Sequence, residues 1–470
     1  MSSKLRAEKD ALGEVMVPSD RLWGAQTQRC LEYFKIGSER MPEAVIRSLA
    51  LVKKAAAQAN ESLEVISPEI SIQIQKAADM IIRAEYRDEF PLTPWQTGSG
   101  THTNMNMNEV IANIANRNLD YPLGGKNPIH PNDHVNLSQS SNDAFPTAMH
   151  VSYAQETTAS LLPRLDALAK ELRNKGQAFV ELLKMGRTHM QDATPLSVSD
   201  EIGAWATQIE QARDRLESGL QEIYPVAQGG TAVGTGLNAP EGFDSLFCEK
   251  LAALTGLPFR TSNDKFAALA AHDGLVAASG DLNRLAVALF KISADVKLLA
   301  SGPRGGLGEL ILPANEPGSS IMPGKVNPTQ AEALAMVCCQ VMGNHHAISM
   351  AGSQGQLQLN VFKPVIIVNL LNSVQLLGDV CDSFRMHCVK GLDLDRDRLA
   401  DLEKKSLMLV TALVPAIGYE KAAKIAHTAH ADRTTLKQAA LKLGFVRTEE
   451  FDRLVNPRSM QKPFSVKNQR

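Results

Sequence analysis

The sequence has little of what marks secreted, membrane or nucleic-acid-binding proteins. Its 470 residues include six cysteines, and no two of them form a CxxC pair. This usage fits a reducing compartment and predicts neither a disulfide framework nor a zinc or iron–sulfur site. The formal net charge is −2 and the pI is about 6.6. The overall charge therefore gives no reason to expect nucleic acid or an anionic membrane as a partner.

Targeting and membrane-spanning signals are also scarce. The first 20 residues are polar and carry charges of both signs, without the apolar stretch of a signal peptide. The acidic residues among them argue against an organelle transit peptide. We find no run of about 18 apolar residues, so we expect no membrane span. The expected compartment is the cytoplasm.

Apolar residues do recur at helical spacing over several long segments. The clearest stripe lies between residues 264 and 300, and others cover 202–220 and the segment after Pro328. A fourth, over 144–183, contains Pro163, where we expect a kink or a break. Because strand-like alternation is scarce and long helices pack best as a bundle, the sequence predicts an all-α fold. The expected parts are a mainly helical N-terminal domain (1–140), a central long-helix bundle (141–365) and a small helical C-terminal domain (366–470).

Polar, glycine-rich loops separate these segments, and the richest is GSSIMPGKVNP at residues 318–328. It places two serines, Lys325 and Asn327 just before a helix expected to begin near Pro328. Because helix N-termini favour anions, Lys325 and Asn327 could hold a carboxylate while a serine acts on a proton. The alternative is a helix-capping loop with a solvated lysine. Spacing alone leaves both interpretations open.

Other loops give weaker signals. His189, beside Thr188, could act as an acid or base near neutral pH, although a structural histidine is the commoner outcome. Hydroxyl and amide groups gather in TGSGT (97–101) and SQSSND (138–143). Such clusters either bind carboxylate oxygens or perform ordinary turn and capping roles.

Two motifs are interpreted as structural. HPND (130–133) is better explained as a surface turn than as a metal pair, because no further ligands follow at metal-like spacing. GGTAVGTG (229–236) has an incomplete dinucleotide fingerprint, and no strand is expected before it. The sequence therefore predicts no metal, no nucleotide and no other cofactor.

Taken together, the loops resemble the fumarase, aspartase and argininosuccinate lyase superfamily. GSSIMPGKVNP is similar to its signature, and TGSGTHTNMNMNEVIANIAN, HPNDHVNLSQSSND and KMGRTHMQDATP are similar to blocks of class II fumarases. The resemblance runs in order from about Arg21 to the C-terminus. It implies a homotetramer with a twenty-helix core, active sites shared between three chains, and a small dicarboxylate, fumarate or L-malate, as substrate in the tricarboxylic acid cycle.

The resemblance also implies residue roles. Ser319 would take the C3 proton of malate, His189 would help the C2 hydroxyl to leave, and Glu332 would orient His189. Lys325 and Asn327 would stabilise the carboxylate as it becomes an aci-form. Further substrate contacts would come from Ser99, Gly100, Thr101, Ser140, Ser141, Asn142, Thr188 and Ser320. A second anion site is implied at His130, Asn132 and Asp133.

Two rival functions remain to be weighed. An aspartate ammonia-lyase could use the same scaffold, but aspartases typically carry glutamine in place of His189 and alanine in place of Gly324. A non-catalytic structural protein would be expected to have lost signature residues, and these are present. His102, Thr103 and His134 depart from the usual fumarase pattern, which leaves affinity, pH optimum and the second anion site open.

Overall fold

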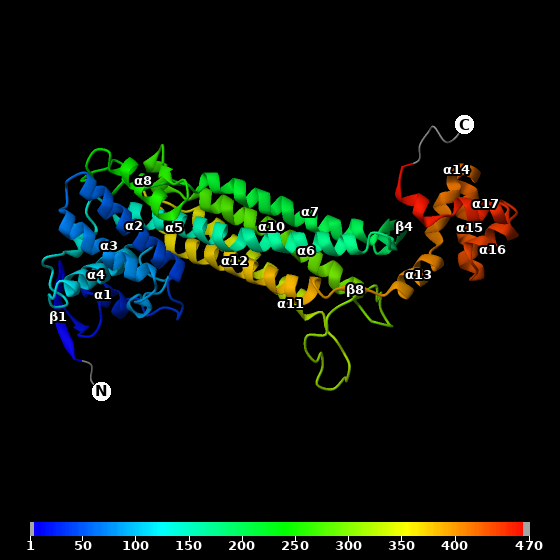
Figure 1. Cartoon of the computed structure of the whole chain (residues 1–470), viewed down its shortest axis with the longest axis horizontal. Helices are drawn as coiled ribbons and strands as arrows, with labels where there is room; N and C mark the ends of the chain where they lie inside the picture. The colour runs from blue at the N-terminus through cyan, green and yellow to red at the C-terminus, as the bar shows by residue number, and fades with distance from the viewer. Residues whose placement is uncertain (1–3, 464–470) are drawn as a thin grey trace. The chain divides into compact units, whose positions relative to one another are not determined.

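The computed structural model describes residues 4–463, and helices form most of its regular structure (Figure 1). The strands in this range make four two-stranded sheets, of which only β5–β6 is parallel. The all-α prediction is confirmed in its main feature. The short ladders were not expected, because runs of two to seven residues carry too little alternation to detect.

The chain divides into two compact units, each made of three stretches. Unit 1 comprises Met1–Pro163, Ala212–Ala286 and Val337–Asp379. Unit 2 comprises Arg164–Gln211, Val287–Met336 and Val380–Arg470. The division into 1–140, 141–365 and 366–470 follows the sequence order instead and stays a prediction.

The elements fall into three groups. Those within unit 1 are β1 (Leu5–Asp10), β2 (Gly13–Pro18), α1 (Ala25–Tyr33), α2 (Glu43–Ser62), α3 (Pro68–Ile82), α4 (Thr101–Asn118), α5 (Ser141–Glu156), β5 (Pro225–Val226), α8 (Phe243–Thr255), β6 (Arg260–Thr261) and α9 (Lys265–Ala270). Long helices shared between the units are α7 (Val198–Gly219), α10 (Asp273–Leu299), α11 (Thr329–Gly352) and α12 (Lys363–Phe384). The remaining helices and strands lie in unit 2, apart from the first residues of α6. They are α6 (Leu162–Ala178), β3 (Leu183–Thr188), β4 (Gln191–Ser197), β7 (Leu310–Ile311), β8 (Asp393–Leu394), α13 (Arg396–Lys405), α14 (Val414–Ile417), α15 (Tyr419–Asp432), α16 (Leu436–Lys442) and α17 (Thr448–Leu454).

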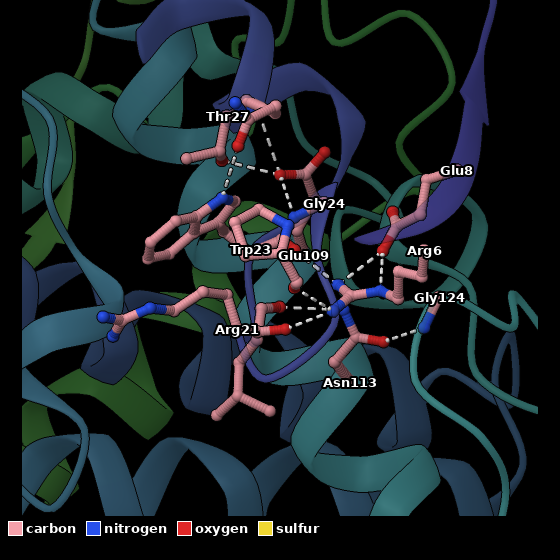
Figure 2. Close-up of polar contacts among 12 residues, drawn as sticks. Arg6, Glu8, Arg21, Trp23, Gly24, Thr27, Glu109, Asn113 and Gly124 are labelled. Carbon is pink, nitrogen blue, oxygen red and sulfur yellow. Dashed lines mark hydrogen bonds and ion pairs between the residues drawn. The ribbon is translucent and has the colours of Figure 1, made fainter. Parts of the chain in front are cut away.

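The N-terminal helices of unit 1 are joined through a buried carboxylate on α4. Glu109 accepts hydrogen bonds from the backbone N–H groups of Gly24, Gln26 and Thr27 and from the Thr27 hydroxyl (Figure 2). These amides form the N-terminal end of α1, which has no capping side chain of its own. A carboxylate there satisfies donors that would otherwise be unpaired and complements the helix dipole. α4 is thereby fixed against α1.

The long helices contact one another in each unit through polar side chains. In unit 1, Ser279 of α10 contacts His345 of α11 at 2.9 Å. In unit 2, the Trp205 indole of α7 donates to Asp295 of α10, and Ser293 of α10 donates to the Ala331 carbonyl of α11. The predicted bundle of long helices is therefore present (Figure 1).

The apolar stripes over 264–300 and 144–183 are each interrupted, and only the second interruption was expected. The segment 264–300 is two helices, because the chain is extended at Ala271 between α9 and α10. The expected irregularity at Pro163 appears as a π-helical turn, Thr157–Leu161. Because proline lacks an N–H and crowds the carbonyl four residues earlier, the ladder is disturbed just before it.

The C-terminal helices of unit 2 have their own apolar core. Residues from α15, α16, α17 and the 3-10 segment Leu407–Leu413 gather around Leu413, Ile425 and Ala440, all fully buried. Met185 of β3 packs into the same cluster. This agrees with the expectation of helical structure near the C-terminus.

Within residues 4–463, one helix is long and apolar enough to cross a membrane by length and composition. It covers Lys363–Val389, and 61% of its most apolar window is buried inside the protein. Asn369, Asn372 and Asp379 interrupt its apolar residues, so it is not a continuous apolar run. A core helix of a water-soluble protein has the same character, so the feature is weak evidence for a membrane span.

Candidate active site

Two helix N-termini in unit 1 bring the predicted hydroxyl clusters together. Ser99 and Gly100 precede α4, and the Ser99 and Thr101 hydroxyls lie 2.7 Å apart. Gly100 has φ +77°, and a Cβ there would lie 2.3 Å from the Phe145 ring of α5. Glycine is required at this position for both reasons. The close approach places the first turn of α4 against α5.

The second cluster forms the N-terminus of α5. The Ser140 hydroxyl accepts the backbone N–H of Asn142, and Asp143 closes a capping box. The Ser141 hydroxyl accepts a hydrogen bond from Asn104 of α4 at 3.1 Å. The Asn142 amide donates to the Ala232 carbonyl at 2.9 Å. Unit 1 thus gathers six of the predicted substrate contacts: Ser99, Gly100, Thr101, Ser140, Ser141 and Asn142.

Asp143 explains why this turn holds its shape. Its fully buried carboxylate accepts the backbone N–H of Ser140 at 2.9 Å through one oxygen. The other oxygen accepts those of Gly229 and Thr231 at 3.0 and 2.8 Å. Burial raises the pKa of Asp143 to about 6, although the three backbone hydrogen bonds and the charge of Lys53 act in the opposite direction. The carboxylate joins two loops that lie far apart in the sequence.

The same contacts account for GGTAVGTG without a nucleotide. Contrary to expectation, a short strand, β5, does precede the motif. The N–H groups of Gly229 and Thr231, however, are already occupied by Asp143. A phosphate would have to displace that carboxylate, so the rejection of a nucleotide site agrees with the geometry.

The HPND segment forms a π-helical turn, Pro131–Val135, rather than a metal pair. The Nδ1 atom of His130 accepts the backbone N–H groups of Asn132 and Asp133, both at 3.1 Å. Burial is the main cause that lowers the pKa of His130. Asn132 also lines a small cavity with Lys9 and Lys126. Among residues 4–463 no group of three or more His, Cys, Asp or Glu side chains is arranged so that it could hold a metal ion.

In unit 2, His189 lies at the tip of the β3–β4 hairpin. His189 and Met190 have φ +55° and +64°, and Thr188 pairs with Gln191. This is the backbone of a two-residue hairpin turn with both residues left-handed. Such conformations are costly for residues other than glycine. Thr188, His189 and Met190 are all exposed.

A buried acid fixes the base of this hairpin. Glu309 is 1% exposed and forms ion pairs with Lys184 at 2.8 Å and with Arg187 at 2.6 Å. Lys184 is also paired with Glu201 of α7 at 2.7 Å. A buried charge is strongly disfavoured without such partners. These ion pairs link β3, the strand that leads to His189, to Glu309 and to α7.

The loop at residues 318–328 presents its first serine to backbone amides. The Ser319 oxygen accepts the N–H groups of Ile321 and Met322 at 3.3 and 3.1 Å. The Asn327 side chain donates to the Gly318 carbonyl at 2.6 Å, and the Gly318 N–H donates to the Lys325 carbonyl at 2.9 Å. These contacts close the loop on itself immediately before α11.

The remaining predicted groups of unit 2 face solvent. Ser320, Lys325 and Glu332 are exposed, with Glu332 in the first turn of α11. Among the described residues, no hydrogen bond or ion pair joins Glu332 to His189. The hairpin tip and the 318–328 loop are thus separate features of unit 2, and each leaves its functional groups accessible.

Two residues of the site in unit 1 were missed. Asp143 stands three residues after Ser140, which is the spacing of a capping box and could have been recognised from the sequence. Lys53 is fully buried and donates to Asn136 and Gln139 at 2.9 and 3.0 Å. No local signal distinguishes it from Lys54, the other lysine of α2, because its partners come from a distant loop.

Comparison with known proteins places this arrangement in a family. Residues 13–343 match the family described as "Lyase", and residues 409–462 match "Fumarase C C-terminus". "Fumarate hydratase class II 2" of Bradyrhizobium diazoefficiens is 56% identical over 458 residues, which is 97% of each chain. "Fumarate hydratase class II" of Rickettsia conorii is 57% identical over 455 residues, covering 97% of this chain and 98% of the relative.

Solved structures agree with the sequence matches. A class II fumarase from Schistosoma mansoni has 47% identity and a TM-score of 0.96, covering 98% of this chain and all of the other. A protein titled "fumarate lyase:delta crystallin", from Brucella melitensis and bound to cobalt, has 39% identity and a TM-score of 0.94. The helical fold, the polar loops and the whole-length similarity together show that this chain belongs to the class II fumarate hydratase family.

Proposed function

We propose that this protein catalyses the reversible hydration of fumarate to L-malate, with Ser319 as the base. The observation that carries the assignment is the environment of the Ser319 oxygen, which accepts two backbone N–H groups. A serine hydroxyl is a weak base unless its alkoxide is stabilised, and preorganised amides provide such stabilisation. The nearby Lys325 ammonium would add to it.

The reaction also requires stabilisation of the negative charge that develops on the substrate. Removal of the C3 proton of malate leaves a carbanion, which becomes accessible when its charge spreads into the neighbouring carboxylate as an aci-form. Catalysis then depends on donors that bind the doubly charged carboxylate better than the ground state. We assign this role to Lys325 and Asn327, which stand at the N-terminal end of α11, where the helix dipole favours negative charge.

His189 is proposed to assist departure of the C2 hydroxyl as water. Its exposed position at a constrained hairpin tip suits a group that acts on a substrate held elsewhere. Glu332 is proposed to orient the imidazole and favour its charged form. Thr188, Ser320 and the six groups of unit 1 are proposed as contacts to substrate oxygens, and His130, Asn132 and Asp133 as a second anion site.

We further propose a homotetramer whose active sites combine residues from three chains. Two observations support it. The proposed catalytic groups His189, Lys325 and Glu332 are exposed on the single chain. Large apolar side chains on α10 and α11 are exposed too, and their burial against another chain would be favourable. They include Val287, Phe290, Met336 and Met350. A cytoplasmic location is proposed from the same family context.

Replacing Ser319 tests the assignment. Ser319→Ala removes the base, and we expect kcat to fall about 10³-fold or more, in the range typical of lost general-base or nucleophilic groups. Ser320→Ala is the matched comparison, because it removes only a proposed contact to substrate and should cost much less. Turnover of L-malate by Ser319→Ala within tenfold of wild type, in an intact assembly, would contradict the role given to Ser319.

A further inference from the structure

A buried histidine without a partner lies against a pocket in unit 1. The pocket has a volume of about 400 Å³ and is lined by residues of α5, α9, the start of α10 and the segment around Pro225. His272 lines it, is 3% exposed, and has no hydrogen-bond partner for either ring nitrogen among the described residues. Leaving a buried polar group unpaired is energetically unfavourable. Such a group calls for a ligand or ordered water.

The buried end of the pocket suits a carboxylate. Burial lowers the pKa of His272 well below its usual value, and Lys363 and His150 lower it further, so the imidazole is neutral and offers one N–H. Asp273 and Gly274, the first residues of α10, line the same pocket. The N-terminus of this 27-residue helix carries partial positive charge and N–H groups that favour an anion.

His150 and Lys363 are themselves engaged by backbone oxygens. His150 contacts the Ile223 carbonyl at 2.7 Å, and the Lys363 ammonium donates to the carbonyls of Asn360 and Leu269. The unpaired nitrogens of His272 are therefore the side-chain groups left to hold a ligand at the buried end.

The open end of the pocket has the opposite character. Four charged side chains line it and are exposed: Glu222, Arg260, Asp264 and Asp273. One oxygen of Asp264 caps α9 by accepting the Ala267 N–H, and Arg260 donates to the Gln221 carbonyl. Three carboxylates against one guanidinium make this end acidic, so it repels a simple anion and attracts a cation.

We propose that this pocket binds a small zwitterion of the amino-acid class. Its carboxylate would meet His272 and the N-terminus of α10, and its ammonium would face Glu222 and the neighbouring acids. The volume falls within the range of about 300–1,000 Å³ usual for small-molecule sites. The proposal does not rest on the hydratase assignment, because none of the proposed catalytic or substrate-binding residues lines the pocket.

The pocket also adjoins the elements that shape the turn of unit 1. Pro146 and His150 of α5 line it, and α5 begins with the Ser140 cap. Ala227 lines it as well, two residues before Gly229, whose N–H is held by Asp143. A bound zwitterion would contact the same helix and loop that position the proposed substrate donors.

Calorimetry with three matched probes tests the proposal on the full-length assembled protein. The probes are γ-aminobutyrate, butyrate and butylamine, which share one carbon chain and differ in their charged ends. We expect γ-aminobutyrate to bind at least about tenfold more tightly than either of the others, the effect of one added charged contact. Equal affinity of butyrate and γ-aminobutyrate would overturn the zwitterion assignment, and absence of γ-aminobutyrate binding would overturn the site.

Variants of the lining residues test whether γ-aminobutyrate binds in this pocket. His272→Phe should weaken γ-aminobutyrate about tenfold or more, whereas His272→Gln, which keeps a donor and an acceptor, should lose about threefold. Glu222→Gln should weaken γ-aminobutyrate but not butyrate, and the exposed Glu241→Gln is its control. Unchanged γ-aminobutyrate binding in both His272→Phe and Glu222→Gln would overturn the location. If His272→Phe fails to assemble, the comparison of Glu222→Gln with Glu241→Gln decides alone.

Discussion

Lys53 is the residue at which burial and charge conflict most clearly. Its ammonium is fully buried and has two amide oxygens, from Asn136 and Gln139, as hydrogen-bond acceptors. Burial lowers its pKa from 10.5 to about 7, while the charge of Asp143 acts in the opposite direction. The lysine and the aspartate together support the turn that carries Ser140 to Asn142. Neither partner of this pair has a side chain that reaches solvent.

Stability should therefore depend on pH in the alkaline range. Between pH 7 and 10.5 the unfolded chain binds a proton at Lys53 that the folded chain has released. Stability then rises with pH, by up to about 1.4 kcal/mol per pH unit for one such group. Lys363 has a pKa lowered to about 7 by burial and acts in the same sense.

Lys53→Met should flatten this rise without abolishing it, since Lys363 remains. The measurement is the urea midpoint of unfolding between pH 7 and 9.5, with the exposed Lys76→Met as control. A wild-type slope that Lys53→Met leaves unaltered would show that the ammonium keeps its proton throughout this range.

The sequence predicts a role for some of the functional residues and not for others. Ser319, His189 and Lys325 were identified because each stands in a motif that resembles a family signature. Lys53 was not identified, because its neighbours in the sequence give no indication of its contacts with Asn136 and Gln139, which are more than 80 residues away. Contacts of this kind arise only when the chain has folded.

At the scale of elements, helix N-termini organise unit 1. α4 and α5 begin beside each other, with Gly100 packed on Phe145 and Asn104 bonded to Ser141. Apolar periodicity over 144–183 predicted helical structure where α5 lies, but it predicted neither α4 nor the break between α9 and α10. Apolar side chains continue on both sides of Ala271, so periodicity alone could not reveal it. The β3–β4 hairpin escaped notice because its turn residues, His189 and Met190, are not usual turn formers.

Asp143→Asn tests whether the α5 N-terminus depends on its link to the 229–231 loop. An amide supplies one acceptor and turns its N–H₂ group toward backbone donors. We expect a loss of about 1–3 kcal/mol in stability and a raised KM for L-malate with a smaller change in kcat. Differential scanning calorimetry and steady-state kinetics measure the two effects.

Asp20→Asn, at an exposed position, controls for loss of charge. An Asp143→Asn protein with the stability and KM of wild type would mean that the loops hold their positions without the buried carboxylate.

At the scale of the whole molecule, the proposed catalytic groups lie in unit 2, whereas six of the proposed substrate contacts lie in unit 1. If each active site takes these groups from different chains, two inactive variants should complement each other. Ser319→Ala combined with Asn142→Ala in a one-to-one mixed tetramer should restore about a quarter of the wild-type sites by random assembly. Turnover after co-expression and purification through two tags measures the restored fraction.

The result of mixing separates two architectures. Each variant expressed alone and purified in the same way gives the baseline. Activity in the mixed assembly no higher than this baseline would mean that Ser319 and Asn142 serve a site within one chain. The sequence could not decide this, since a monomer sequence contains no signal for which copy completes a site.

The most direct test of the central claim is the absorbance of fumarate near the ultraviolet edge. Purified full-length protein is mixed with L-malate and, separately, with L-aspartate. A class II fumarate hydratase with His189 and Gly324 in place should form fumarate from L-malate and none from L-aspartate. Fumarate from L-aspartate, accompanied by ammonia and without turnover of L-malate, would contradict the account and make this chain an ammonia-lyase.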